Sequence, residues 1–263
     1  MARHAQRSRW SSQFVNGPLA ALVAALALFA ASTAEAAEAP AVDATALAAK
    51  GQALALAHAA VVGVLATAVD DAGSIATLGR ERQGSGVVVG SDGLVLTIGY
   101  LILEADHVDL IVEGERTVPA RVVAYDQASG FGLLQALAPL RVAAVGLGRS
   151  SALTTNEPLM VASGGRDGEL SLARLVSRRA FSGYWEYHLD EALFTAPPRT
   201  DHSGAGLFNA DGELLGIGSL VVTDALGPGG GRVPGNMFVP VDLLKPILGE
   251  LRERGSSSLS SRA

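Results

Sequence analysis

Residues 84–97 have the sequence GSGVVVGSDGLVLT, in which two runs of valine and leucine flank a short polar break that contains glycine. Valine favours strands, and Asp-Gly supplies the positive backbone φ angle that a tight hairpin turn needs. The stretch therefore predicts an antiparallel hairpin that turns at Ser91-Asp92-Gly93. The sequence on both sides repeats this pattern, so the hairpin also indicates the fold class.

Short apolar runs broken by turn residues recur about every 8–12 positions from Val61 to about residue 240, as expected for an all-β barrel or sandwich. Glu113-Gly114 and Asn209–Gly212 are two further predicted turns. Two helices are predicted in addition. The Ala-rich stretch 42–57 favours a helix because alanine is the best helix former, and the leucines after Pro240 recur at helical spacing.

The two ends of the chain differ in composition from the middle. A basic start is followed by an apolar run and by Ala34-Glu35-Ala36, which is the order found in secretory signal peptides. The apolar run is shorter than the roughly 20 residues of a membrane-spanning helix. We therefore expect residues 1–36 to be removed as a signal peptide, with no membrane span left afterwards. Residues 255–263 are Ser-rich and are expected to be disordered.

Composition narrows the classes of partner. The 263 residues carry a formal net charge of −6, 49% of them are hydrophobic, and there is no cysteine. An acidic chain lacks the electrostatic footprint of a nucleic-acid binder, and the hydrophobic content is sufficient for a packed core. The loop Ser163–Gly168 lacks the Gly-Lys-Ser/Thr ending of a phosphate-binding loop, and alternation places Glu186, His188 and Asp190 on a polar strand face. The sequence therefore predicts neither a cofactor nor a metal centre.

Three segments resemble the protease domain of HtrA (DegP-type) serine proteases. The hairpin at 84–97 is similar to the family's Gly-Ser-Gly hairpin, and residues 118–134 are similar to its stretch with Asp before a leucine pair. Residues 201–217 resemble the segment that carries the nucleophilic serine. The resemblance implies a trypsin-like double β-barrel, all-β apart from a short N-terminal and a C-terminal helix.

The resemblance extends over residues 58–254, after an N-terminal helical segment at 37–57. It implies a first barrel at about 58–140, a second at about 156–240, and a cleft between them. Members of the family usually continue into a PDZ domain, whereas nine residues follow Arg254 here. The sequence therefore predicts a protease-type domain without that module.

The resemblance also implies that two catalytic residues are replaced. In the family a His follows the hairpin in a Thr-x-x-His pattern, and the corresponding residue here is Tyr100. The family's Asp corresponds to Gly130, whereas Ser203 matches the nucleophile. A serine hydroxyl needs a neighbouring base to take its proton, and a phenol with a pKa of about 10 is protonated at neutral pH. Tyr100 therefore cannot act as that base.

The implied oxyanion hole is altered as well. Family members have Gly two residues before the nucleophile, where its N–H and that of the serine meet the developing charge, and this chain has Asp201 before Ser203. Loss of the catalytic His alone costs on the order of 10⁶ in turnover in subtilisin, and a damaged oxyanion hole costs about 10²–10³. Either loss predicts a protein without useful proteolysis.

Three functions are compatible with the sequence. The favoured one is an exported, periplasmic or secreted, non-catalytic homologue that binds peptides or unfolded or envelope protein segments by strand addition. The residues expected to add the strand are Ile217, Gly218, Ser219 and Leu220. The second is an active serine endopeptidase that pairs Ser203 with a rewired base, His107 or His202. The third is a structural envelope-interaction domain that uses no peptide cleft.

Overall fold

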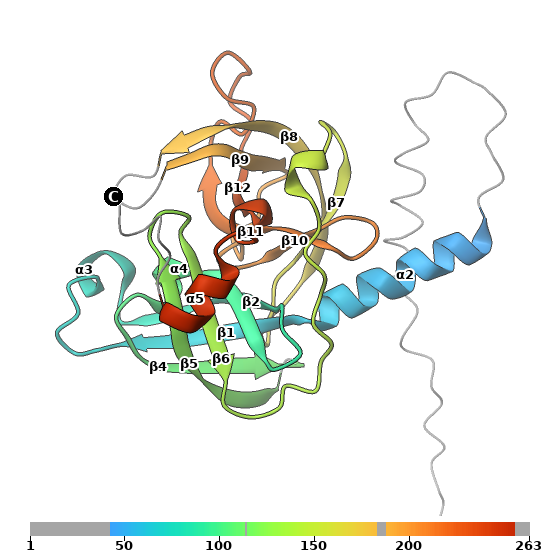
Figure 1. Ribbon diagram of the computed structural model, residues 1–263. Coiled ribbons are helices and arrows are strands. Elements are labelled where there is room, and N and C mark those ends of the chain that lie inside the picture. The colour runs from blue at the N-terminus through green and yellow to red at the C-terminus, as the bar shows by residue number, and fades with distance from the viewer. Residues whose placement is uncertain (1–42, 114, 183–187, 256–263) are drawn as a thin grey trace, which may run out of the picture.

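The computed structural model describes residues 43–113, 115–182 and 188–255. The predicted signal peptide and the residues of the predicted tail from 256 onwards lie outside this part of the chain. Twelve strands of the described residues form two closed antiparallel barrels of six strands each (Figure 1). The all-β, two-barrel fold that the sequence predicts is confirmed.

The first barrel is built around the hairpin at 84–97. Val87 pairs with Leu96, and Gly93 has φ +84° in the turn, as the Asp-Gly sequence predicts. Around the barrel the strand order is β1-β2-β3-β6-β5-β4. In that order the bounds are β1 (Val61–Ala68), β2 (Glu81–Val88), β3 (Leu94–Ile98), β6 (Phe131–Ala136), β5 (Arg116–Asp126) and β4 (Ala105–Val112).

The second barrel has the same architecture, with the order β10-β11-β12-β9-β8-β7. Its turn at Asn209–Gly212 again uses a glycine with positive φ, Gly212 at +75°. In the order given, the strands are β10 (Gly206–Phe208), β11 (Leu214–Val222), β12 (Gly235–Pro240), β9 (His188–Ala196), β8 (Leu170–Ser182) and β7 (Pro158–Ala162).

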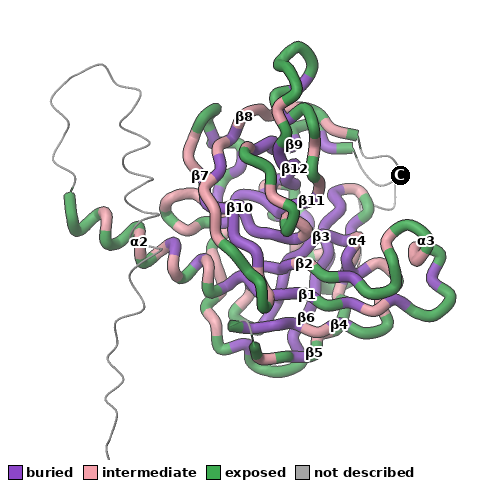
Figure 2. Tube along the Cα trace, turned by 180° about the vertical axis from the view of Figure 1, so that it is seen from behind, coloured by how far each residue is buried: buried purple, intermediate pink, exposed green. Residues whose placement is uncertain are grey.

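The hydrophobic core fills both barrels and joins them. One buried cluster contains residues of the first barrel, such as Leu96 and Phe131, together with Phe208 and Met237 of the second. A smaller cluster around Phe238 belongs to the second barrel. Figure 2 shows the buried strands as a continuous purple interior under an exposed surface of loops. The two barrels therefore share their packing.

The helices lie outside the barrels. Helix α2 (Ala44–Ala59) begins at Asp43, whose side chain accepts a hydrogen bond from Thr45 N at 2.9 Å. It buries Leu54 and Ala57 near its end, while its first turns project away from the barrels (Figures 1 and 2). None of the helices in the described ranges is long and apolar enough to cross a membrane.

The predicted C-terminal helix is present, but it starts later than the leucine spacing suggested. A 3₁₀ turn η2 (Val241–Leu243) comes first, and helix α5 (Leu248–Arg254) packs on β5. Pro246 separates the two because it has no N–H to donate within a helix. The remaining helices are the short α3 (Ile75–Leu78), α4 (Gly99–Ile102) and η1 (Ser150–Ala152).

The barrels meet at strand β2. Gly164 follows β7, and its N–H donates to Ser85 Oγ at 2.9 Å. A side chain at Gly164 would collide with the backbone of Val62, so the close approach of the barrels requires glycine there. The N–H of Ser85 donates to the carbonyl of Ser203 at 2.8 Å. Strand β2 therefore holds the loop that carries Ser203.

Candidate functional site

Ser203 lies in the loop between β9 and β10, directly before a glycine whose backbone conformation is left-handed. Gly204 has φ +74°, and a Cβ atom there would overlap the carbonyl of Ser85. Its N–H donates to the carbonyl of Gly218 at 2.8 Å. These contacts fix the sharp turn that presents the Ser203 side chain at the junction of the two barrels.

Tyr100 reaches this junction from the first barrel. It lies on α4, the single turn that follows β3, and its hydroxyl oxygen is 2.7 Å from Ser203 Oγ and 2.8 Å from the Ser219 carbonyl. A phenol has one proton and a carbonyl oxygen can only accept, so the phenol donates to Ser219. The Ser203 hydroxyl then donates to the phenol oxygen. The proton of Ser203 is thus directed at a neutral phenol.

Gly130 lies in the turn between β5 and β6 with φ +78°. Its carbonyl accepts a hydrogen bond from the N–H of Gly99, at 2.7 Å, and therefore holds the start of α4. The buried Asp126, four residues earlier, accepts from the N–H and the hydroxyl of Ser129 at 2.9 and 2.6 Å. Position 130 thus supports the Tyr100 segment through its backbone.

Asp201 turns its carboxylate towards two polar side chains. It accepts from Arg199 Nε at 2.9 Å and from the hydroxyl of Ser163. Burial by itself would raise the pKa of Asp201, but the hydrogen bonds from Arg199 and Ser163 outweigh it and hold the pKa below its ordinary value. A carboxylate at the implied oxyanion position would repel a developing negative charge, and pairing of Asp201 with the Arg199 guanidinium reduces this repulsion.

Neither of the two histidines considered as a rewired base is hydrogen-bonded to Ser203 Oγ in the part of the chain that the structure describes. His107 lies on β4, is 62% exposed, and has its Nε2 3.2 Å from the Asp109 carboxylate. His202 Nδ1 is 3.0 Å from the Thr200 carbonyl. Burial lowers the pKa of His202, although nearby backbone carbonyls and Asp201 favour its charged form.

Strand β11 changes its surroundings along its length. Ile217 pairs with Gly206 on one side and Val239 on the other, and both backbone groups of Gly218 are hydrogen-bonded inside the barrel. A bulge lies between Gly218 and Leu220, and the β10 ladder ends at Ile217. Among the described residues, 220–222 pair with β12 alone. Of the residues expected to add a peptide strand, Ile217 and Gly218 are thus already paired within the barrel.

Asn236 is a polar residue of this region that the sequence did not single out. It is buried on β12, and its Oδ1 accepts from Arg199 N at 2.7 Å. Its Nδ2 donates to Arg199 O at 2.9 Å and to Leu220 O at 3.4 Å. Asn236 thereby ties the loop before Ser203 to β11. Because this contact joins segments far apart in the chain, no local pattern could have indicated it.

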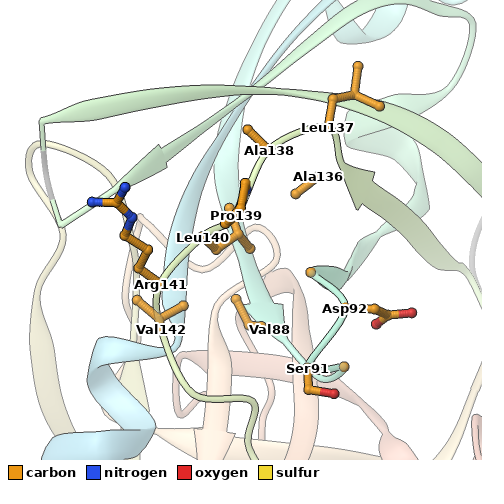
Figure 3. Close-up of a pocket in the computed structure, with 12 residues that line it drawn as sticks. Val88, Ser91, Asp92, Ala136, Leu137, Ala138, Pro139, Leu140, Arg141 and Val142 are labelled. Carbon is orange, nitrogen blue, oxygen red and sulfur yellow. The ribbon is translucent and has the colours of Figure 1, made fainter.

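A hollow of about 550 Å³ lies elsewhere, between the β2–β3 turn and the linker that follows β6. Figure 3 shows Val88, Pro139 and Val142 around it, with Asp92 and Arg141 pointing in different directions. Leu137, on its rim, is 59% exposed. None of the predicted site residues lines this hollow, so it is a second place where a ligand could be tested.

The fold and the Ser203 turn define the class of this protein. Residues 84–217, half of the chain, match the model of the trypsin-like peptidase domain, and the chain belongs to that family. Within the family it is a homologue of the HtrA-type serine proteases, as the predicted resemblance implies.

Two curated relatives illustrate the homology. A probable periplasmic serine endoprotease DegP-like of Hahella chejuensis is 28% identical over 178 residues, which is 67% of this chain and 37% of that protein. The periplasmic pH-dependent serine endoprotease DegQ of Escherichia coli is 28% identical over 179 residues, or 66% and 38%. The chain thus matches well under half of the length of these relatives.

Solved structures show the same fold. The HtrA-type protease AlgW with tripeptide superposes with a TM-score of 0.63 at 19% identity, over 78% of this chain and 64% of that chain. A variant form of the same protease, also with tripeptide, gives the same TM-score at 18% identity. At this level of identity the comparison shows the trypsin-like architecture alone.

Proposed function

We propose that this protein is a non-catalytic HtrA-type homologue that binds extended peptide segments at the junction of its barrels. The hydrogen-bonded group of Ser203, Tyr100 and the Ser219 carbonyl carries the proposal. Tyr100 takes the place of the family's base, and Gly130 takes the place of the Asp that would orient it. The nucleophile position is kept while the means of activating it is lost.

The acid–base chemistry supports this reading of the site. Acylation needs a base that removes the Ser203 proton as the hydroxyl attacks. A phenol that still carries its own proton, here directed at the Ser219 carbonyl, accepts a hydrogen bond but is a very weak base. Glycine at 130 has no carboxylate to hold a base in place. Asp201 places a carboxylate, paired with Arg199, beside the proposed oxyanion position, where the family has glycine.

Peptide binding needs none of these groups. Residues 220–222 follow the end of the β10 ladder and keep one side of β11 for an added strand, with Val221 48% exposed. The related AlgW structures are described as complexes with a tripeptide, which places a peptide on a protein of the same fold. Strand addition along Ser219–Val222 is the mode that the proposed function uses.

The proposed setting is outside the cytoplasm. Two of the curated relatives are described as periplasmic, and the order of basic, apolar and small residues over 1–36 is that of a secretory signal. N-terminal sequencing of the protein from an expressing bacterium should give a new terminus after about Ala36. An uncleaved Met1 in the cytosolic fraction would contradict this part of the proposal.

The first test asks whether the protein cleaves peptide bonds. The purified protein is incubated with β-casein, which is unfolded in solution, next to its Ser203→Ala variant, and both are treated with a fluorophosphonate probe. We expect intact casein and no rapid covalent labelling in either sample. Cleavage or labelling that disappears in Ser203→Ala would establish the active endopeptidase instead.

The second test asks where unfolded protein binds. Fluorescein-labelled β-casein is titrated with the wild type, with Val221→Asp and with Leu137→Asp, and the fluorescence anisotropy is followed. We expect Val221→Asp to weaken binding by about tenfold, or about 1.4 kcal/mol, and Leu137→Asp to leave it unchanged. The reverse result would place binding in the hollow of Figure 3. No binding by the wild type would favour the structural envelope domain.

A further inference from the structure

We infer that Arg82 is a positioning residue, which holds Tyr100 in place across the Ser203 and Ser219 groups and connects this position to the loop around α3. The inference deepens the proposed function, on which it rests, because it concerns how the Ser219 carbonyl is made available to a peptide.

The Arg82 side chain is buried beneath α4. The residue lies on β2 and is 6% exposed. Its Nη1 donates to the carbonyls of Tyr100 and Leu103 at 3.0 and 2.5 Å. Tyr100 lies within the single turn α4 and Leu103 follows its last residue, and the carbonyls at the end of a helix have no partners inside it. One guanidinium nitrogen therefore closes the turn that carries the phenol.

The rest of the guanidinium reaches the loop before β2. Nε donates to the Gly79 carbonyl at 3.1 Å, and Nη2 donates to Ser74 Oγ at 2.6 Å. Ser74 Oγ in turn donates to the Glu104 carboxylate at 2.5 Å, and the N–H of Ser74 donates to it at 2.9 Å. Glu104 is the second residue after α4. Arg82 and Glu104 thus clamp α4 and the α3 loop together from two sides.

Arginine is suited to this position because its planar fork spreads donors over three nitrogens that face different segments, whereas the three N–H donors of a lysine ammonium lie on a single nitrogen. At its other end, α4 is held by the hydrogen bond from Gly99 N to Gly130 O. The backbone of Tyr100 is therefore fixed on both sides. A fixed backbone keeps the phenol on the Ser219 carbonyl, which the His202 side chain also approaches, and there the phenol competes with the N–H of an added peptide.

The experiment is a double-mutant cycle on the full chain with fluorescein-labelled β-casein as the probe. Tyr100→Phe removes the competing hydroxyl and should tighten binding by about 3- to 10-fold, the range for one net hydrogen bond. Arg82→Met should tighten binding in the presence of Tyr100 by a smaller factor, and it should have no effect in the Tyr100→Phe background. This lack of additivity is a signature that a general loss of stability does not produce.

Arg80→Met is the matched control. Arg80 lies just before the same strand, is 53% exposed at its side chain, and pairs with Asp70. Binding should be unchanged in this variant. If Arg82→Met does not fold, as judged by circular dichroism, Arg82→Lys takes its place and should give an intermediate effect. Equal effects of the Arg82 variant with and without the Tyr100 hydroxyl would overturn the inference.

A second measurement keeps the inference separate from the proposed function. In protein labelled with ¹³C at the tyrosine ring, the Tyr100 signal is assigned by its loss in Tyr100→Phe. The signal should move in Arg82→Lys and stay in place in Arg80→Met, whether or not casein binds. An unmoved signal in Arg82→Lys would refute the positioning role. Failure of the wild type to bind casein would instead refute the proposed function.

Discussion

At the scale of single residues, the site is defined by what surrounds one hydroxyl group. Ser203 keeps the sharp turn of a trypsin-like nucleophile, but its hydrogen-bond partner is a phenol and its neighbour Asp201 is paired with Arg199. Compared with the pattern of the family, these differences concern single side chains, while the turn that carries Ser203 is the same. On the proposed non-catalytic function, replacing one of these residues should not by itself produce proteolysis, because catalytic groups of this kind act together.

The first prediction follows from Gly130. Tyr100→His places an imidazole next to Ser203, but no carboxylate orients it, and loss of the orienting Asp costs about 10⁴ in turnover in chymotrypsin-type enzymes. We expect faster fluorophosphonate labelling than in the wild type and no measurable hydrolysis of casein. Adding Gly130→Asp should help little, because φ +78° is a conformation that side chains rarely adopt. Hydrolysis by Tyr100→His alone would contradict this.

The second prediction concerns pH. Burial lowers the pKa of His202 below 6.5, so its contribution to stability is present above pH 6.5 and is lost as the pH falls through the lower folded pKa. Between pH 7 and 5 the free energy of unfolding of the wild type should fall relative to that of His202→Gln. Urea denaturation at several pH values measures the difference. A difference that stays constant over this range would be inconsistent with the assigned shift.

At the scale of elements, β11 is where barrel and site meet. The part of β11 up to Ile217 is paired with strands on both sides, and a bulge lies between Gly218 and Leu220. The first part therefore belongs to the barrel wall, whereas Ser219 at the bulge contacts Tyr100. Gly218 is the residue at which this change occurs. A Cβ atom there would overlap the carbonyl of His202, so glycine is required for the loop before Ser203 to lie on the strand.

The third prediction tests this contact. Gly218→Ala should lower the free energy of unfolding by about 1–3 kcal/mol, because the backbone on both sides has to shift to relieve the overlap. Thermal denaturation followed by circular dichroism gives the value. Gly249→Ala is the control, since no atom lies within 4 Å of a Cβ at that helical position. Equal stabilities of the Gly218 variant and the wild type would exclude the close contact.

At the scale of the whole molecule, the barrels are joined by a shared core and by a backbone contact at one glycine. The main buried cluster contains side chains from both barrels, and Gly164 lies directly against Val62. The N–H of Gly164 in the second barrel donates to Ser85 Oγ on β2, and the N–H of Ser85 donates to the Ser203 carbonyl. The geometry of the site therefore depends on how the two barrels pack against each other.

The fourth prediction concerns the contact between the barrels at Gly164. Gly164→Ala should destabilise the protein and also weaken casein binding, because separation of the barrels pulls the first barrel away from β11, which contacts β3 across the junction. Gly146→Ala, in the linker between the barrels, is the control with no atom within 4 Å of its Cβ. Urea denaturation and anisotropy measure the two effects. Normal binding by a destabilised Gly164→Ala variant would show that the site does not depend on the interface.

Local sequence was sufficient to predict the strands, the turns and the fold class. Alternation and Asp-Gly turns act over a few residues, so the hairpin at 84–97 could be predicted from its own composition. The C-terminal helix was predicted with the wrong start, because Pro246 interrupts the leucine spacing. The resemblance to a family added the two-barrel arrangement and the roles to expect at Tyr100, Gly130 and Ser203.

Only the tertiary structure determined which side chains contact one another at the site. Tyr100 and Ser203 are separated by 103 residues, so their hydrogen bond, like the contact of Arg82 with the Tyr100 carbonyl, depends on how strands from two barrels are placed in space. The pairing of the Asp201 carboxylate with Arg199 and Ser163, which reduces its repulsion of a developing negative charge, likewise depends on the tertiary structure. Spacing along a chain specifies elements, whereas the partner of a polar atom is fixed by packing in three dimensions.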